Sequence, residues 1–419
     1  MSHTIRVVDN VRDWLDLNKS TTRSFMFVNK EAGGLGIMHP RTQYYACRLA
    51  FFLSVLNSDD ACVRHTARTS LTLHMTRRKV TAAQRDDTQF AGYRVTEAGT
   101  LDKQSKVNWP ASQWVNLFEM LHREGIVLKK QGDTFVYELE LSGKQCVVES
   151  PRGFSLAYKE KLCVEFREDW LKLKSQGRVS RDSRDSVDSR SSGTYLQNHK
   201  LNDRLVSFVV KGRLQLLPCQ SLLSIYYPHI HTKGCKLCPH PTENASHVLN
   251  GCPRFQCAYQ NRHNRIVDIL SDKVGHFNAD ADILKDVPLK PSHFSDGVEG
   301  HTFLTRSTRP DITVIDKTNM TVHIVEVAVS FDAFAKVCYQ KKFEKYIDLS
   351  NEIGALGYTS QIVVLVIGSL GNVHKRFRSG LRKVNLPMYE SNFLAKFCSV
   401  SAIIGSHMIW KMRCSMMNV

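Results

Sequence analysis

Hydrophobic positions in the last third of the chain alternate between strand-like and helix-like spacing. Residues 312–315 and 321–329 are β-branched runs separated by Asp-Lys-Thr-Asn at 316–319, a sequence with turn chemistry, and together they predict a β-hairpin. A lysine-bearing helix follows, and residues 361–368 form an apolar run of strand length. We therefore expect a mixed sheet flanked by helices within residues 259–419.

The first half of the chain carries a different pattern. Apolar positions in residues 1–85 follow helical spacing, whereas residues 86–200 are less regular and contain a possible hairpin around Ser142-Gly143. The stretch 175–193 is rich in Ser, Arg and Asp and nearly lacks apolar residues, so burial cannot offset the entropy of ordering it, and we expect a disordered connector. The predicted fold is α+β and multidomain, with a helical region (1–85), a linker region (86–200), a helix plus a small cysteine-rich segment (201–258) and an α/β domain (259–419).

Charge adds information about partners. The 419 residues carry a formal net charge of +17 and a pI near 9.4, which favours a polyanionic partner, nucleic acid before an acidic membrane. We expect no membrane partner, because no apolar run approaches the roughly 20 residues that a span requires. The N-terminus lacks the apolar core of a secretory signal. Twelve scattered cysteines favour a reducing compartment over a disulfide scaffold.

Four soft or borderline ligands cluster in the cysteine-rich segment. Cys235, Cys238, His247 and Cys252 follow the spacing Cys-x₂-Cys-x₈-His-x₄-Cys, which suits tetrahedral Zn²⁺. A segment this small has little core, so zinc binding would fold it, with about 10–16 kcal/mol available in peptide systems. Four protein ligands leave no position open for water, which predicts a structural zinc site. Lower-ranked alternative ligands are His231, His240 and Cys257.

Two carboxylates define a second candidate site. The predicted hairpin brings Asp311, near the start of one strand, close to Glu326, in the middle of its partner. Paired carboxylates repel each other, and a hard divalent cation such as Mg²⁺, or Mn²⁺ in its place, relieves that repulsion. Such an ion lowers the pKa of a bound water and stabilises charge on a phosphate.

The sequence Arg309-Pro310-Asp311, followed by Glu326 on the next strand, resembles the PD-(D/E)-x-K nucleases. Position 328, where that motif carries lysine, is Ala328, so the amine would come from the following helix. Lys342 and Lys345 lie on its more inward flank and are the candidates, while Lys341 shares a polar side with other charged residues.

Several basic residues are candidates for contacts with nucleic acid. One group opens a predicted helix after the cysteine-rich segment, where backbone N–H groups already favour phosphate. Another group lies near the C-terminal end and would bind the phosphate backbone, and Arg309 precedes the first acid. The candidate residues are Arg262, His263, Arg265, Arg309, Lys375, Arg376 and Arg378.

The ordered set of motifs resembles the C-terminal part of site-specific non-LTR retrotransposon proteins. The matching features are the CCHC knuckle, Arg262-His263-Asn264, Arg-Pro-Asp, the strand acid and the helix from Lys342 to Tyr346. Gly33-Gly34-Leu35-Gly36-Ile37 is similar to the segment after the polymerase active site, at the thumb. The resemblance implies a thumb-like region, a zinc knuckle and a restriction-endonuclease-like domain.

What the resemblance implies is an endonuclease that nicks target DNA so that the 3′ hydroxyl primes reverse transcription. Its partners would be target DNA and element RNA, and it would be made in the cytoplasm and act in the nucleus. A polymerase palm is absent from the sequence, so we expect no reverse transcription from this chain, which resembles part of a polyprotein or a truncated copy. The alternative hypotheses are a catalytically inactive zinc-knuckle remnant that binds nucleic acid, and a zinc-stabilised protein scaffold. The sequence leaves the target sequence and the oligomeric state open.

Overall fold

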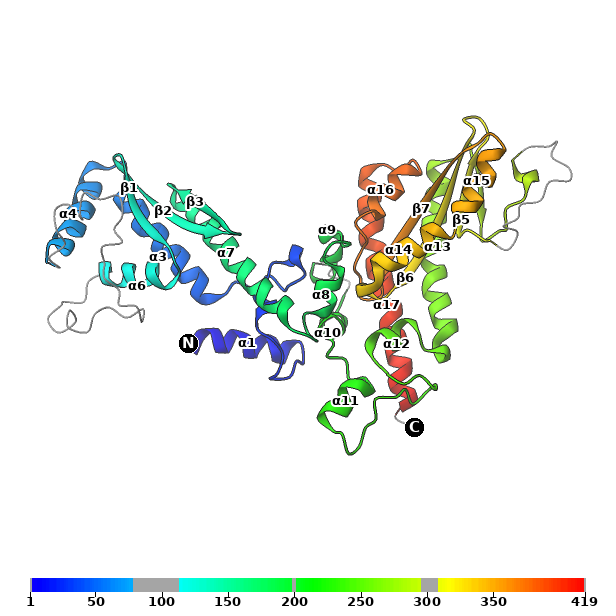
Figure 1. Ribbon diagram of the computed structural model, residues 1–419, viewed down its shortest axis with the longest axis horizontal. Helices are drawn as coiled ribbons and strands as arrows, with labels where there is room; N and C mark the ends of the chain where they lie inside the picture. Colours follow the sequence, from blue (N-terminus) through cyan, green and yellow to red (C-terminus); the bar gives the residue numbers. More distant parts are fainter. Residues whose placement is uncertain (1, 78–112, 198–200, 295–307, 418–419) are drawn as a thin grey trace. The chain divides into compact units, whose positions relative to one another are not determined.

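A computed structural model describes residues 2–77, 113–197, 201–294 and 308–417. The chain divides into two compact units, the first formed by residues 1–8, 26–28 and 36–168 and the second by residues 9–25, 29–35 and 169–419. Both units contain helices and one β-sheet, so the predicted α+β class is confirmed (Figure 1).

The first unit packs helices against a three-stranded antiparallel sheet with strand order β1-β2-β3. Leu49 and Leu53 of one helix share a core with Tyr137 and Leu139 of the central strand. The unit contains α3 (Pro40–Leu56), α4 (Ala61–Arg77), α6 (Gln113–Arg123), β1 (Val127–Gln131), β2 (Thr134–Leu141), β3 (Lys144–Val148) and most of α7 (Pro151–Lys172).

The helices expected in residues 1–85 are present as far as Arg77, and the remainder of that range lies outside the described residues. The hairpin around Ser142-Gly143 is confirmed as β2 and β3, with Leu141 paired to Lys144. Residues 113–168 are not a linker, contrary to prediction, because their aromatic and aliphatic side chains complete the core of α3 and α4.

The second unit is built on a four-stranded mixed sheet with strand order β4-β5-β6-β7. β4 (Asp282–Lys285), β5 (Ile312–Asp316) and β6 (Thr321–Ser330) are antiparallel neighbours, and β7 (Thr359–Gly368) pairs in parallel with β6. The expected mixed sheet and the buried strand over 361–368 are therefore confirmed.

Helices cover both faces of this sheet (Figure 1). Val325 and Val327 point toward α13, α16 and α17, while Ile324 and Ala328 point toward α14 and α15, as strand alternation requires. These helices are α13 (Gln256–Phe277), α14 (Ala335–Glu344), α15 (Ile347–Ala355), α16 (Phe377–Lys383) and α17 (Met388–Met417).

Further helices precede the sheet. They are α1 (Ser2–Trp14), which crosses the division between the units, α2 (Ser24–Phe27), α8 (Arg178–Ser183), α9 (Ser189–Ser192), α10 (Asp203–Arg213), α11 (Gln220–Tyr226) and α12 (Ala245–Asn250).

The stretch 175–193 is folded, which corrects the prediction of disorder. Its buried serines bond locally, because Ser183 Oγ donates to the carbonyl of Val179 and Ser191 Oγ donates to Asp188 Oδ2. Asp188 also pairs with Arg378 of α16, with Nε–Oδ2 at 2.7 Å. The composition of the stretch predicted that too few side chains would be buried to order it. Serine side chains are small, and when their hydroxyl groups find local hydrogen-bond partners they can be buried at low free-energy cost.

Among the described helices, α17 alone is long and apolar enough to cross a membrane by length and hydropathy. The expectation from sequence concerned uninterrupted apolar runs, whereas α17 contains charged residues such as Lys396 and Lys411. Half of its apolar window is buried inside the protein, as in a core helix, and a core helix passes the same test.

Candidate active site and metal centre

Asp311 and Glu326 lie opposite each other on neighbouring segments of the mixed sheet. β5 and β6 pair Ile312 with Val325, the last pair at this end of the ladder, and Asp311 directly precedes β5 beside Glu326 and Val327. Asp311 Oδ2 also accepts a hydrogen bond from the backbone N–H of Val327 at 2.7 Å, which holds the carboxylate against β6.

Glu326 is buried beneath α14 and the start of α15. Its Oε1 forms an ion pair with Nζ of Lys342, and its Oε2 accepts a hydrogen bond from the Tyr346 hydroxyl at 2.5 Å. Burial opposes the charge of the lysine, but the negative charge of Glu326 outweighs it and raises the pKa of Lys342. Burial and then Glu326 raise the pKa of Tyr346, which therefore stays a hydrogen-bond donor.

The two candidate lysines occupy different positions. Lys342 is in the last turn of α14, whereas Lys345 lies in the break between α14 and α15, with its Nζ 3.8 Å from Glu326 Oε1 and 2.9 Å from the Tyr346 hydroxyl. Lys341 is exposed. Both candidates thus approach Glu326, and Lys342 makes the direct contact.

His263 contacts the acid pair instead of projecting freely into solvent. From α13 its Nε2 lies 3.4 Å from Asp311 Oδ2 and 3.1 Å from the carbonyl oxygen of Val327. Burial disfavours the imidazolium, but the hydrogen bond to Asp311 and its negative charge outweigh burial and raise the pKa of His263 to about 9. The histidine predicted to contact nucleic acid is therefore a charged partner of Asp311 at neutral pH.

The other predicted contacts with nucleic acid have mixed outcomes. Arg265, Arg309, Lys375 and Arg376 are exposed, as a backbone-binding role requires.

Two of the predicted contacts are wrong. Arg262 is buried, with Nη1 donating to Ser406 Oγ of α17 at 2.7 Å, because it lies on the core side of α13. Arg378 is half-buried and bound to Asp188 and Asn392. The Arg262 guanidinium is therefore enclosed in the protein, and that of Arg378 is already paired with a carboxylate.

Sequence reasoning did not include Tyr346 among the site residues. A usable signal was its position four residues after Lys342, the spacing that places two side chains on one side of a helix.

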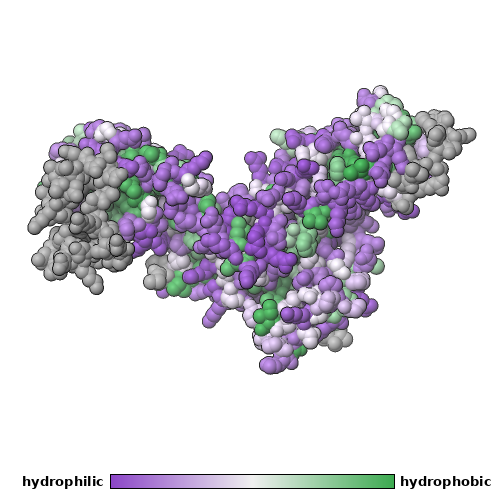
Figure 2. Space-filling view, viewed as in Figure 1, coloured by the Kyte–Doolittle hydropathy of each residue, from purple (hydrophilic) through white to green (hydrophobic). Residues whose placement is uncertain are grey.

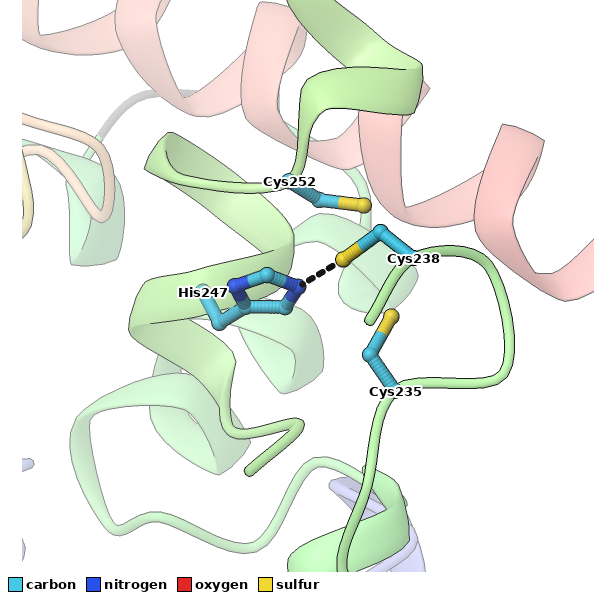
Figure 3. Close-up of side chains that lie close together, drawn as sticks. All are labelled: Cys235, Cys238, His247 and Cys252. Atoms are coloured by element: carbon cyan, nitrogen blue, oxygen red, sulfur yellow. Dashed lines mark hydrogen bonds between the residues drawn. The ribbon is translucent and has the colours of Figure 1, made fainter. Parts of the chain in front are cut away.

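The predicted zinc ligands come together in the second unit (Figure 3). The ligand atoms of Cys235, Cys238, His247 and Cys252 all lie within 4.8 Å of one another, and Cys238 Sγ is 3.3 Å from His247 Nε2. Two thiolates on one tetrahedral zinc ion are about 3.8 Å apart, given Zn–S bonds of roughly 2.3 Å. The cluster could therefore hold a metal ion such as zinc.

Local structure positions each ligand. Asn244 caps α12 by accepting the backbone N–H of His247 at 2.8 Å, and Cys252 follows directly after this helix. Cys235 and Cys238 lie in the loop before it, where the backbone N–H of Leu237 points to Cys235 Sγ at 3.4 Å. The alternative ligands are outside the cluster, because His240 stacks on His247, His231 Nδ1 is 3.1 Å from Gln220 Oε1, and Cys257 is exposed.

The chemistry of the cluster suits a cation. Burial raises the pKa of the Cys235 thiol to about 12, and burial also raises the pKa of Cys252, so a positive ion is needed to keep these sulfurs as thiolates. Burial and then the neighbouring His240 lower the pKa of His247, which favours the neutral imidazole that binds metals.

A buried ion pair attaches the cluster to the C-terminal helix. Arg413 Nη2 of α17 lies 2.6 Å from Glu243 Oε1, and the same oxygen accepts the backbone N–H of Gln220 at 3.0 Å. The end of the loop that precedes α12 is thus held by both α11 and α17.

In comparisons with known proteins, no protein-family profile matches the chain and no curated protein sequence matches it significantly.

Proposed function

We propose that the second unit is a metal-dependent DNA endonuclease with a restriction-endonuclease-like core, of the kind found in site-specific non-LTR retrotransposons. The observation that carries this proposal is the arrangement of Asp311 and Glu326, opposed across a hairpin, with the Lys342 amine on Glu326. A mixed sheet covered by helices on both faces is compatible with that core.

In this proposal Asp311 and Glu326 hold Mg²⁺ or Mn²⁺, together with the carbonyl oxygen of Val327. What supports this role is that two carboxylates and a carbonyl on adjacent segments are hard oxygen ligands. When bound, such an ion lowers the pKa of a water and stabilises negative charge on a phosphate. His263 donates to Asp311 and to the Val327 carbonyl, which orients both groups.

Lys342 would orient the attacking water or neutralise charge on the phosphorane, with Lys345 as the second candidate for that role. Tyr346 fixes the second oxygen of Glu326 and leaves the first for the lysine and the cation. Arg309 precedes Asp311 and is exposed, so we place it against the scissile phosphate. Arg265, Lys375 and Arg376 would contact the DNA backbone, which adds affinity but little sequence choice.

The other roles follow from the same proposal. The Cys₃His cluster would bind zinc structurally, and residues 1–85 would form a thumb-like region. The biological partners would be target DNA and element RNA, and the site of action would be the nucleus, where a nick would prime reverse transcription.

The test is nicking of supercoiled plasmid in Mg²⁺ by the zinc-loaded protein. Wild type should convert plasmid to open circles, and Asp311→Ala and Glu326→Ala should both abolish conversion. Asp348→Ala is the matched control, because this exposed carboxylate of α15 is near Tyr346 in sequence but is not part of the acid pair. DNA binding without nicking would instead support the inactive remnant. The absence of both DNA binding and nicking would support a protein scaffold.

A further inference from the structure

An exposed apolar surface lies between α11 and the metal cluster, within the second unit. Its members are large side chains at the end of α11 and in the following turn, namely Ile225, Tyr226, Tyr227 and Ile230, with 69%, 47%, 55% and 74% of their surface exposed. Hydrophobic atoms reach the surface at α11 amid hydrophilic neighbours (Figure 2). Soluble proteins rarely expose four large side chains of this kind within six positions. An exposed apolar surface of this density therefore marks an interaction site.

The charged residues in this segment of the sequence are nearly all basic. Between Arg204 and Val267 the sequence contains a single acidic residue, Glu243, and that carboxylate is buried against Arg413. Lys233 and Lys236 are exposed, and among the described residues neither forms an ion pair. This segment therefore offers aromatic rings and exposed lysines, and its own sequence adds no exposed carboxylate that would repel a polyanion.

We propose that the α11 surface, formed by Ile225, Tyr226, Tyr227 and Ile230, binds single-stranded nucleic acid by stacking bases on its tyrosines. Unpaired bases offer apolar faces that match exposed aromatic rings, while Lys233 and Lys236 match the phosphates that follow. A duplex hides its base faces inside the stack, so it gains only the phosphate contacts. This activity goes beyond strand cleavage and holds whether or not Asp311 and Glu326 bind a cation.

The geometry of the rings is compatible with this role. The Tyr226 hydroxyl lies 3.3 Å from Ser20 Oγ, which steadies one edge of the ring, yet nearly half of the residue stays exposed. Tyr227 follows the last residue of α11, and its ring centroid is 6.3 Å from that of His231. A second copy of this chain fits less well as the occupant, because the net charge of +17 repels an identical partner.

The experiment is fluorescence anisotropy with the full zinc-loaded chain and two probes, a labelled oligothymidylate strand and a labelled duplex of the same length. The Tyr226→Ala/Tyr227→Ala variant should bind the single strand about tenfold more weakly and bind the duplex as wild type does. The dependence of affinity on salt concentration should not change, because the variant keeps every lysine and arginine that can contact a phosphate. Tyr226→Phe/Tyr227→Phe should bind the strand as wild type does, since stacking needs the ring and not the hydroxyl.

Tyr389→Ala is the matched control, because Tyr389 is an exposed tyrosine on α17 and should leave both affinities unchanged. Equal loss of strand and duplex binding in the alanine variant, or no loss of either, would overturn the proposal. So would failure of the phenylalanine variant, which would point to the hydroxyl groups. Concentration-dependent dimers in sedimentation that disappear in the alanine variant would assign the surface to a second copy instead.

Discussion

Lys342 and Glu326 form a direct ion pair between the last turn of α14 and the middle of β6. The amine therefore reaches the strand acid from a helix, although position 328 of the strand is alanine. The ion pair and burial hold the Lys342 amine in one position, so the amine is pre-organised. Pre-organised charged groups give the largest electrostatic stabilisation of a transition state.

We predict that Lys342→Ala lowers the rate of plasmid nicking about 100-fold, the usual effect of losing one pre-organised donor. Lys345→Ala should reduce it less, because its Nζ lies 3.8 Å from Glu326. Lys341→Ala, an exposed neighbour, is the control and should match wild type. Single-turnover nicking at saturating protein separates this effect from binding, and equal rates for the Lys342 and Lys341 variants would rule out the role.

The metal cluster should contain one zinc ion that Cys238→Ser removes. Loss of one thiolate leaves three ligands, and the binding free energy that stabilises this small segment, about 10–16 kcal/mol in peptide systems, is largely lost. Zinc content by atomic absorption and thermal unfolding should both fall. Cys257→Ser changes an exposed cysteine outside the cluster and should keep the metal; equal zinc in both variants would contradict the assignment.

Asp188 should hold the folded stretch 175–193 in place. Asp188→Ala leaves the partly buried Arg378 without its carboxylate and removes the cap of α9, so we expect a loss of about 3 kcal/mol. Urea unfolding measures that loss. Brief trypsin treatment should cleave the variant at the exposed arginines of the stretch 175–193 before it cleaves elsewhere. Arg382→Ala, an exposed residue of α16, is the control. Rapid cleavage of the wild-type protein within this stretch would show that the stretch is disordered, as its composition predicts.

His374 should make stability depend on pH. Burial, then the charges of Arg376 and Lys375, lower the pKa of His374 from 6.5 to about 4, so the folded protein keeps a neutral imidazole where the unfolded chain takes up a proton. This contribution is complete above pH 6.5 and is lost as pH falls toward 4.

The urea midpoint of wild type should therefore fall between pH 7 and pH 4.5 more than that of His374→Phe. Phenylalanine keeps the ring that stacks on Tyr339 at 4.6 Å but cannot be protonated. Parallel decreases in the two proteins would show that other groups cause the dependence.

The parts of the site that sequence predicts are those fixed by local rules. A four-residue turn, in which the backbone N–H of Asn319 donates to Asp316 Oδ1, joins β5 to β6, and their register brings Asp311 near Glu326. The cysteine spacing similarly places four ligands around one point, because the Cys-x₂-Cys loop and a single turn of α12 have little freedom.

The parts that sequence misses depend on packing between distant segments. Arg262 and His263 are adjacent on α13, yet only the position of α17 decides that the arginine is buried on Ser406, and only the sheet brings the histidine to Asp311. The stretch 175–193 is polar by composition, and its Asp188 is bound by Arg378, which lies 190 residues away in the sequence. The break between α14 and α15, which separates the two candidate lysines, contains no proline or glycine from which it could be predicted.

Asp311 and Glu326 together should hold one divalent cation, and titration of Mn²⁺ into the zinc-loaded protein, followed by electron paramagnetic resonance, tests this most directly. Wild type should bind one Mn²⁺ that Mg²⁺ displaces, and Asp311→Asn and Glu326→Gln should each lose that ion, because either change removes a charged ligand. Retention of the same Mn²⁺ by both variants would contradict the account.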